Sequence, residues 1–249
     1  MNARSRSWEQ MGAASGLFAV LLFAAAFIIF LNTDPSGGNT PRLPNIANSQ
    51  AAPGFYATHI NGIKAQVMLN GLGLVLFLWF LGTLWGVLRT AEGGPAKGSA
   101  IASGGALVGV ALTLVGLVLT GASTLVTTLP QAETVSTLYI AAALSFAFGG
   151  GAFAVFFFGV AEITLRAGGL PKWLAWLAML AGIVSVFGFV TPYAQSGIFN
   201  PATGGLGFYA HYIAFGVWLF LASAVLALSQ HRRRRESAQR TGGAEGAAA

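Results

Sequence analysis

The stretch VMLNGLGLVLFLWFLGTLWGVL, residues 67–88, contains no charged side chain. A helix needs about 20 mostly apolar residues to cross roughly 30 Å of hydrocarbon. A strand of a transmembrane barrel would instead alternate apolar and polar residues over about ten positions. The stretch therefore predicts a transmembrane α-helix.

The rest of the chain supports the same fold class. Of its 249 residues, 55% are hydrophobic and only 8% are charged, whereas ordinary globular domains carry about 25% charged residues. Five further apolar stretches are long enough to span a bilayer, near residues 11–31, 100–119, 138–165, 173–190 and 209–229. We therefore expect an all-α integral membrane protein with six transmembrane helices in one domain, residues 1–231.

Lysine and arginine positions predict the orientation, because cytoplasmic loops carry an excess of both. One side receives most of them: Arg4, Arg6, Arg89, Lys97, Arg166, Lys172, Arg240 and the run 232–235. The other side receives only Arg42 and Lys64. Both termini are thus expected in the cytoplasm, with one long external loop between the first two spans.

Two segments outside the spans have distinct compositions. Within the external loop, residues 45–66 have few helix breakers and favour a short interfacial helix before the second span. Residues 232–249 combine a basic run with a Gly- and Ala-rich end, and we expect a disordered cytoplasmic tail. The first span is longer than the apolar part of a typical signal peptide and lacks a small-x-small cleavage site, which favours a retained span.

The net charge of +6 does not indicate a nucleic-acid-binding protein, because no basic face with interleaved aromatic residues lies outside the spans. Basic residues beside a span instead attract anionic headgroups, and this contact is expected for Lys172, Arg232, Arg233, Arg234 and Arg235. The chain has no cysteine, which excludes disulfides and thiolate metal sites. An Ala-, Gly- and Arg-rich composition suggests a GC-rich bacterium, and hence its cytoplasmic membrane.

A short motif occurs twice, as GFYATHI at residues 54–60 and GFYAHYI at residues 207–213. Glycine followed by aromatic residues suits a helix that begins at the headgroups. Alternatively, His59 and His211 could be ligands of a metal or a haem. The histidines stand five and four residues after the glycine, a difference that rotates a helical side chain by about 100°. The sequence therefore favours interfacial helix starts, with no cofactor.

Glu162 is the only carboxylate inside an apolar span. An intramembrane ionisable group is by default a candidate for function, such as proton transfer or binding of a cation. Arg166 follows one helical turn later, a spacing that favours an ion pair. We expect the pair to be structural and to lie near the cytoplasmic interface.

Glycines cluster within the spans. Gly149, Gly150 and Gly151 are consecutive, and two pairs have small-xxx-small spacing, Gly82 with Gly86 and Gly105 with Gly109. Glycine allows helices to pack closely, and it can also mark a broken helix at a transporter's substrate site. The lack of a matching glycine cluster in a second span favours packing.

Two stretches carry a family resemblance: LRAGGLPKWLAWLAMLAGIVS, residues 165–185, and LVLFLWFLGTLWGVLRTAEGG, residues 74–94. Together they resemble actinobacterial six-helix membrane proteins in the class of domains of unknown function. The resemblance covers the second to fifth spans and implies no activity, and therefore no catalytic residue.

Three functional hypotheses follow. The sequence contains no H-E-x-x-H, G-x-S-x-G or P-loop motif, so a catalytic function is not indicated. The leading hypothesis is a structural or interaction subunit that binds a protein partner through its glycine-lined faces. A transporter or channel for a small solute or lipid is the first alternative, with a path past Thr113, Thr120 and Ser145. A haem or metal redox protein is the second.

Overall fold

The computed structural model describes residues 3–32, 46–127, 132–194, 196–200 and 206–246. Six helices in this part are long and apolar enough to cross a membrane. They are α1 (Ala3–Leu31), α3 (Ile60–Glu92), α4 (Lys97–Val126), α5 (Ala132–Ala167), α6 (Lys172–Phe187) with its 3-10 continuation η2 (Gly188–Tyr193), and α7 (Leu206–Gly246). No β-strand occurs in these ranges. The predicted all-α membrane fold with six spanning helices is confirmed.

Two short elements precede α3. The 3-10 helix η1 (Ile46–Ala51) leads into α2 (Ala52–Thr58), which begins with a proline in its first turn and ends at His59. Proline is well suited to the first turn because its missing N–H would have no helical partner there. Both elements fall within residues 45–66, where the sequence favours a short interfacial helix.

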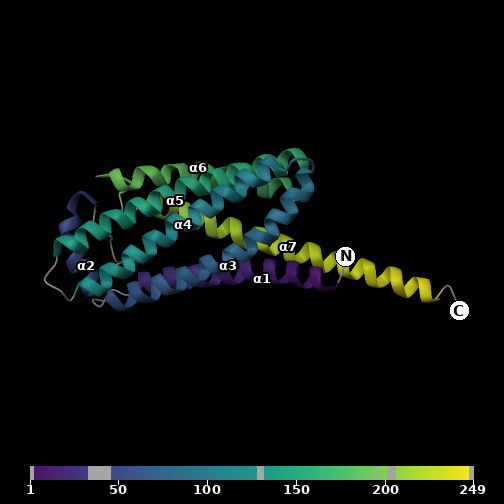
Figure 1. The fold of residues 1–249 in the computed structure, drawn as a ribbon, viewed down its shortest axis with the longest axis horizontal. Coiled ribbons are helices and arrows are strands. Elements are labelled where there is room, and N and C mark those ends of the chain that lie inside the picture. The colour runs from purple at the N-terminus through teal and green to yellow at the C-terminus, as the bar shows by residue number, and fades with distance from the viewer. Residues whose placement is uncertain (1–2, 33–45, 128–131, 195, 201–205, 247–249) are drawn as a thin grey trace.

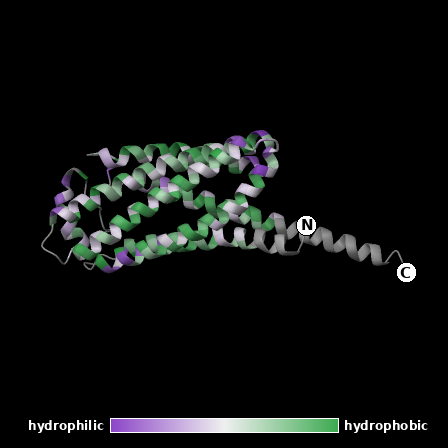
Figure 2. Cartoon of the chain, viewed as in Figure 1, coloured by the Kyte–Doolittle hydropathy of each residue, from purple (hydrophilic) through white to green (hydrophobic). Residues whose placement is uncertain are grey.

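The spanning helices form two layers with α7 between them (Figure 1). Helix α5 packs against both α4 and α6, and α1 packs along α3. Both termini lie at the end of the bundle where α3 connects to α4 and α5 to α6, which we call the termini end. The opposite end carries η1, α2 and η2, and we call it the η end. Hydrophilic residues gather at these two ends, and the middle is hydrophobic (Figure 2).

Glycine brings α4 and α5 close together. A methyl group on Gly105 would lie 2.8 Å from the Phe156 amide nitrogen and 2.9 Å from the Ala152 carbonyl oxygen. One on Gly109 would lie 3.0 Å from the Phe153 ring. The predicted packing role of this glycine pair is therefore seen within the chain.

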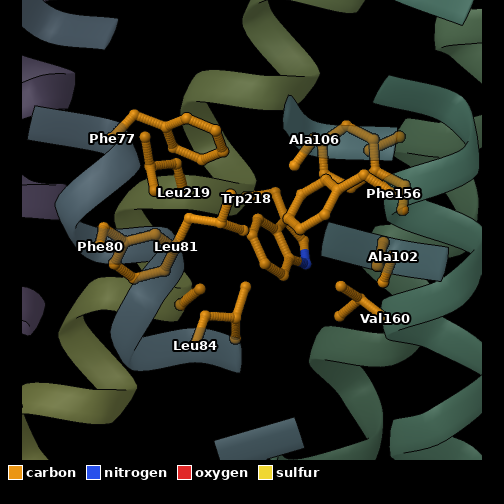
Figure 3. Close-up of a cluster of buried hydrophobic side chains, with 14 of the residues drawn as sticks. Phe77, Phe80, Leu81, Leu84, Ala102, Ala106, Phe156, Val160, Trp218 and Leu219 are labelled. Atoms are coloured by element: carbon orange, nitrogen blue, oxygen red, sulfur yellow. The ribbon is translucent and has the colours of Figure 1, made fainter. Parts of the chain in front are cut away.

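The half of the bundle nearest the termini end is filled by a dense core around Trp218 of α7 (Figure 3). Its ring centroid lies 5.4 Å from those of Phe156 and Phe157, and its indole Nε1–H donates to the Leu174 carbonyl oxygen at 3.2 Å. That hydrogen bond satisfies the one polar atom of a fully buried indole. It also ties α7 to the start of α6.

The structure differs from the sequence-based expectation at two places. Gly82 and Gly86 pack against no other helix of the described chain, because α3 turns its opposite face, with Phe77, Phe80 and Leu84, toward the core. Helix α7 continues to Gly246, where we expected a disordered tail. Arg, Glu, Ala and Gln are common in this segment and favour helix, so the helix of the last span propagates into it.

Candidate ligand cavity

A cavity of about 640 Å³ lies between the two layers, in the half of the bundle nearest the η end. It is lined by the inward faces of α1, α3, α4 and α5, by α7, by Ser185 of α6, and by residues of the short elements at the η end. Small-molecule sites in proteins typically measure about 300–1,000 Å³. The cavity is therefore large enough for an organic ligand.

The depth of the cavity corresponds to about one leaflet of a bilayer. Its lining on α7 runs from Tyr209 to Leu221, which at 1.5 Å per residue is about 18 Å along the helix. Its lining on α5 runs from Tyr139 to Phe153, or about 21 Å. Half of the hydrocarbon core of a membrane is about 15 Å thick.

Four phenylalanines, Phe23, Phe77, Phe153 and Phe215, pack together at the inner part of the cavity, and all of them except Phe77 line it. The ring centroid of Phe215 lies 4.9 Å from that of Phe153, 5.1 Å from that of Phe77 and 6.1 Å from that of Phe23. These are ordinary distances for favourable aromatic pairs. The lining ends at Leu74 on α3, Phe153 on α5 and Leu221 on α7, so the cavity does not reach the termini end.

The polar groups that line the cavity are mostly hydroxyls and amides. No Asp, Glu, Lys or Arg is among its lining residues in the described part of the chain. Of the three residues on the predicted solute path, Thr113 and Thr120 line the cavity and Ser145 does not. The hydroxyls of both threonines donate to carbonyl oxygens of their own helix. The other polar lining residues are Gln66, Asn70, Ser185, Thr191, His211, Tyr56, Tyr139, Tyr209 and Tyr212.

The tyrosines give the η end of the cavity its polar character. Tyr56 of α2 is buried, and its ring lies edge-on to that of Tyr139, with 6.2 Å between centroids. Burial raises the pKa of the Tyr56 hydroxyl, while hydrogen bonds with Thr120 and Ser123 act in the opposite direction. This phenol is therefore neutral at physiological pH and fixes α2 to α4.

The two copies of the repeated motif occupy different environments. His211 is buried, lines the cavity and packs beside Gly150 and Gly188. His59 is not a lining residue: its Nδ1 lies 2.8 Å from the Phe55 carbonyl oxygen, and its ring lies 4.6 Å from that of Phe55. No group of three His, Cys, Asp or Glu that could hold a metal occurs in the described residues. The absence of a shared ligand stays a prediction.

Glu162 lies at the termini end, away from the cavity. It forms the predicted ion pair with Arg166 at 3.0 Å, with exposed side-chain fractions of 46% and 79%. Nearby, the Glu92 carboxylate accepts hydrogen bonds from the backbone N–H groups of Gly98 and Ser99 at 2.7 and 2.8 Å. Glu92 thus satisfies free N–H groups in the first turn of α4, and neither acid lines the cavity.

The consecutive glycines do not break α5, which is continuous from Ala132 to Ala167. A methyl group on Gly149 would meet Thr113 and Gly109 of α4, and one on Gly151 would overlap the Phe189 ring of η2. Gly150 lines the cavity. The glycines therefore allow neighbouring elements to approach, as predicted, and one of them also shapes the cavity.

Lys172 is exposed at the start of α6, next to the exposed rings of Trp173 and Trp176. This arrangement suits an interface with headgroups at the termini end. The side chains of Arg232, Arg233, Arg234 and Arg235 lie outside the part that the structure describes.

Sequence reasoning missed the cavity and two of its lining residues. Gln66 is the last residue of the predicted interfacial segment, and Asn70 lies in the second predicted span without an assigned role. Their spacing of four residues, which places both on one face of a helix, is the signal that could have joined them. No protein family, functionally described protein or solved structure matches the chain. The cavity is therefore the feature from which a function can be inferred.

Proposed function

We propose that this protein is a membrane carrier that binds a hydrophobic or amphipathic molecule of the bilayer. The observation that supports this proposal is a cavity about one leaflet deep that does not reach the termini end and has no Asp, Glu, Lys or Arg among its described lining residues. A channel needs a path through both leaflets, whereas a lipid carrier needs a space for an apolar chain. The cavity fits the second requirement.

The surface of α7 offers a route into the cavity. Ile213, Val217 and Phe220 line it, yet their exposed fractions are 47%, 46% and 49%. Apolar side chains with such exposure on a spanning helix face hydrocarbon rather than water. A lipid tail could therefore enter sideways past α7, without leaving the apolar part of the membrane.

The proposal includes an orientation. With both termini in the cytoplasm, the η end faces outward and the cavity occupies the outer leaflet. The lysine and arginine distribution supports this orientation. The resemblance to actinobacterial six-helix proteins supports a bacterial cytoplasmic membrane, and Lys172 and residues 232–235 would hold the termini end to anionic headgroups.

A photolabelling experiment tests ligand entry. The purified protein in nanodiscs is irradiated with a long-chain alkyl diazirine, and labelled peptides are mapped by mass spectrometry. We expect labels on the inward face of α5 between Tyr139 and Phe153. A Gly216→Leu substitution should suppress them, because Gly216 lines the cavity and a side chain there would enter open space.

Gly104→Leu is the matched control. A side chain at Gly104 also meets open space, but Gly104 does not line the cavity. It should leave the α5 labels unchanged. Equal labelling of the wild type and Gly216→Leu at these positions, or no labelling of the wild type there, would refute the proposal.

An interaction subunit is the second candidate function. Gly82 and Gly86 lie on an exposed face of α3 beside the exposed rings of Trp79 and Trp85. Small residues on such a face allow another membrane helix to approach closely. Loss of a co-purifying protein from a Gly82→Leu, Gly86→Leu double variant, with cavity labelling intact, would favour this function. A haem pair is not favoured, because His211 lines the cavity and His59 does not.

A further inference from the structure

The residues of α3 that face the cavity point to the chemistry of its ligand. We infer that Gln66 and Asn70 form the receptor for the head of an uncharged lipid, one that carries carbonyl or hydroxyl oxygens. This inference rests on the proposed carrier function and specifies its substrate class.

Gln66 and Asn70 are half-buried, stand four residues apart on α3 and both line the cavity. Residues at this spacing lie on the same face of a helix. Neither amide makes a hydrogen bond with another described residue, although Thr and Ser side chains in the neighbouring helices bond to their own backbone. The cavity wall thus includes two neighbouring amides that have no hydrogen-bond partner among the described residues.

An amide without a partner is costly in an apolar setting, because its donors and acceptor lose their hydrogen bonds with water. Each side chain presents two N–H donors and one carbonyl acceptor. Ester, ketone or hydroxyl oxygens of a ligand can satisfy these donors, and a hydroxyl can also donate to the acceptor. The amide pair therefore matches an oxygen-bearing, uncharged head.

The negative charge of a phosphate makes the common phospholipids poor candidates for the preferred ligand. A phosphate buried without a cation would lose its hydration with no compensating pair. No lysine or arginine in the described part of the chain lines the cavity, and the only basic residue there that does is the buried His211. Lys64, two residues before Gln66, is exposed. Diacylglycerols and isoprenoid quinones are two classes of lipid with an uncharged, oxygen-bearing head.

Competition against the alkyl diazirine tests this inference. Dioleoylglycerol, decylubiquinone and dioleoylphosphatidylglycerol are titrated separately into labelling reactions in nanodiscs. We expect at least one of the two uncharged lipids to suppress the α5 labels at a concentration at least tenfold lower than the anionic lipid requires. The uncharged lipid that suppresses the labels identifies the class of lipid that the cavity binds.

Substitutions of Gln66 and Asn70 test whether these two amides bind the head of the lipid. Asn70→Leu and Gln66→Leu should still take up the headless diazirine, but the uncharged lipid should compete about three- to tenfold less well, as expected for a lost hydrogen bond. Asn61→Leu is the matched control, since Asn61 is an exposed residue of the same helix outside the cavity. It should leave competition unchanged.

A second readout separates recognition from a structural role. If the amides serve only the ligand, the unliganded Asn70→Leu protein should melt at the same temperature as the wild type or higher, because an unpaired polar group has been removed. A lower melting temperature with unchanged competition would overturn the inference. Equal competition by phosphatidylglycerol and the uncharged lipids would also overturn it, while leaving the carrier function standing if the cavity is labelled.

Discussion

Adjacent glycines on α4 allow a direct test of how this bundle is held together. A methyl group on Gly105 would lie within 3 Å of α5 backbone atoms, 2.8 Å from the Phe156 nitrogen and 2.9 Å from the Ala152 oxygen. A methyl group on Gly104 would meet no atom within 4 Å. We therefore predict that Gly105→Ala and Gly104→Ala have different effects on stability.

The size of the difference follows from two terms. Each substitution gains up to about 1 kcal/mol, because alanine favours helix over glycine. This gain is common to both variants and cancels in the comparison. Gly105→Ala must in addition push two backbones apart, and overpacking of this kind costs about 1–3 kcal/mol. Gly105→Ala should therefore be about 1–3 kcal/mol less stable than Gly104→Ala.

Reversible unfolding in mixed micelles, followed by circular dichroism as the fraction of denaturing detergent rises, measures this difference. Gly104→Ala should unfold at the same fraction as the wild type or a higher one, and Gly105→Ala at a lower fraction than Gly104→Ala. Identical midpoints for the two variants would refute the reasoning, because they would show that α4 and α5 do not pack through Gly105.

Three further predictions concern the ends of the bundle. Glu162→Gln should change the free energy of unfolding by no more than about 1 kcal/mol, since its ion pair is exposed; a larger loss, or loss of lipid binding at normal abundance, would contradict a structural role. Glu92→Ala should lower the melting temperature, because two N–H groups at the start of α4 lose their acceptor; an unchanged value would argue against this cap. Reporters fused after Arg235 and near Gly38 should signal the cytoplasm and the outside, respectively, and reversed signals would place the cavity in the inner leaflet.

The extent to which sequence predicted the site differs from residue to residue. The Glu162–Arg166 pair and the Gly105–Gly109 contact depend on spacing within one helix and on small size, so both could be predicted. Gly82 and Gly86 have the same spacing as Gly105 and Gly109 but face away from the core. Spacing shows that residues share a face of a helix, and it does not show what that face contacts.

The sequence by itself determined the spanning helices. An apolar stretch of this length must satisfy its backbone hydrogen bonds internally in a membrane, and a helix does so within the segment. Each helix is therefore specified locally, as residues 67–88 illustrate. The sequence also placed most basic residues at one end, which supports a prediction of orientation.

Only the tertiary structure decided that the two layers separate toward the η end and leave a cavity there. That separation depends on how side chains from distant helices fill the space, since the core around Trp218 fills one half of the bundle and the cavity occupies the other. It also decided that Gln66 and Asn70 face this cavity rather than lipid or another helix. These outcomes depend on contacts between segments far apart in the chain, and periodicity along a single helix does not encode them.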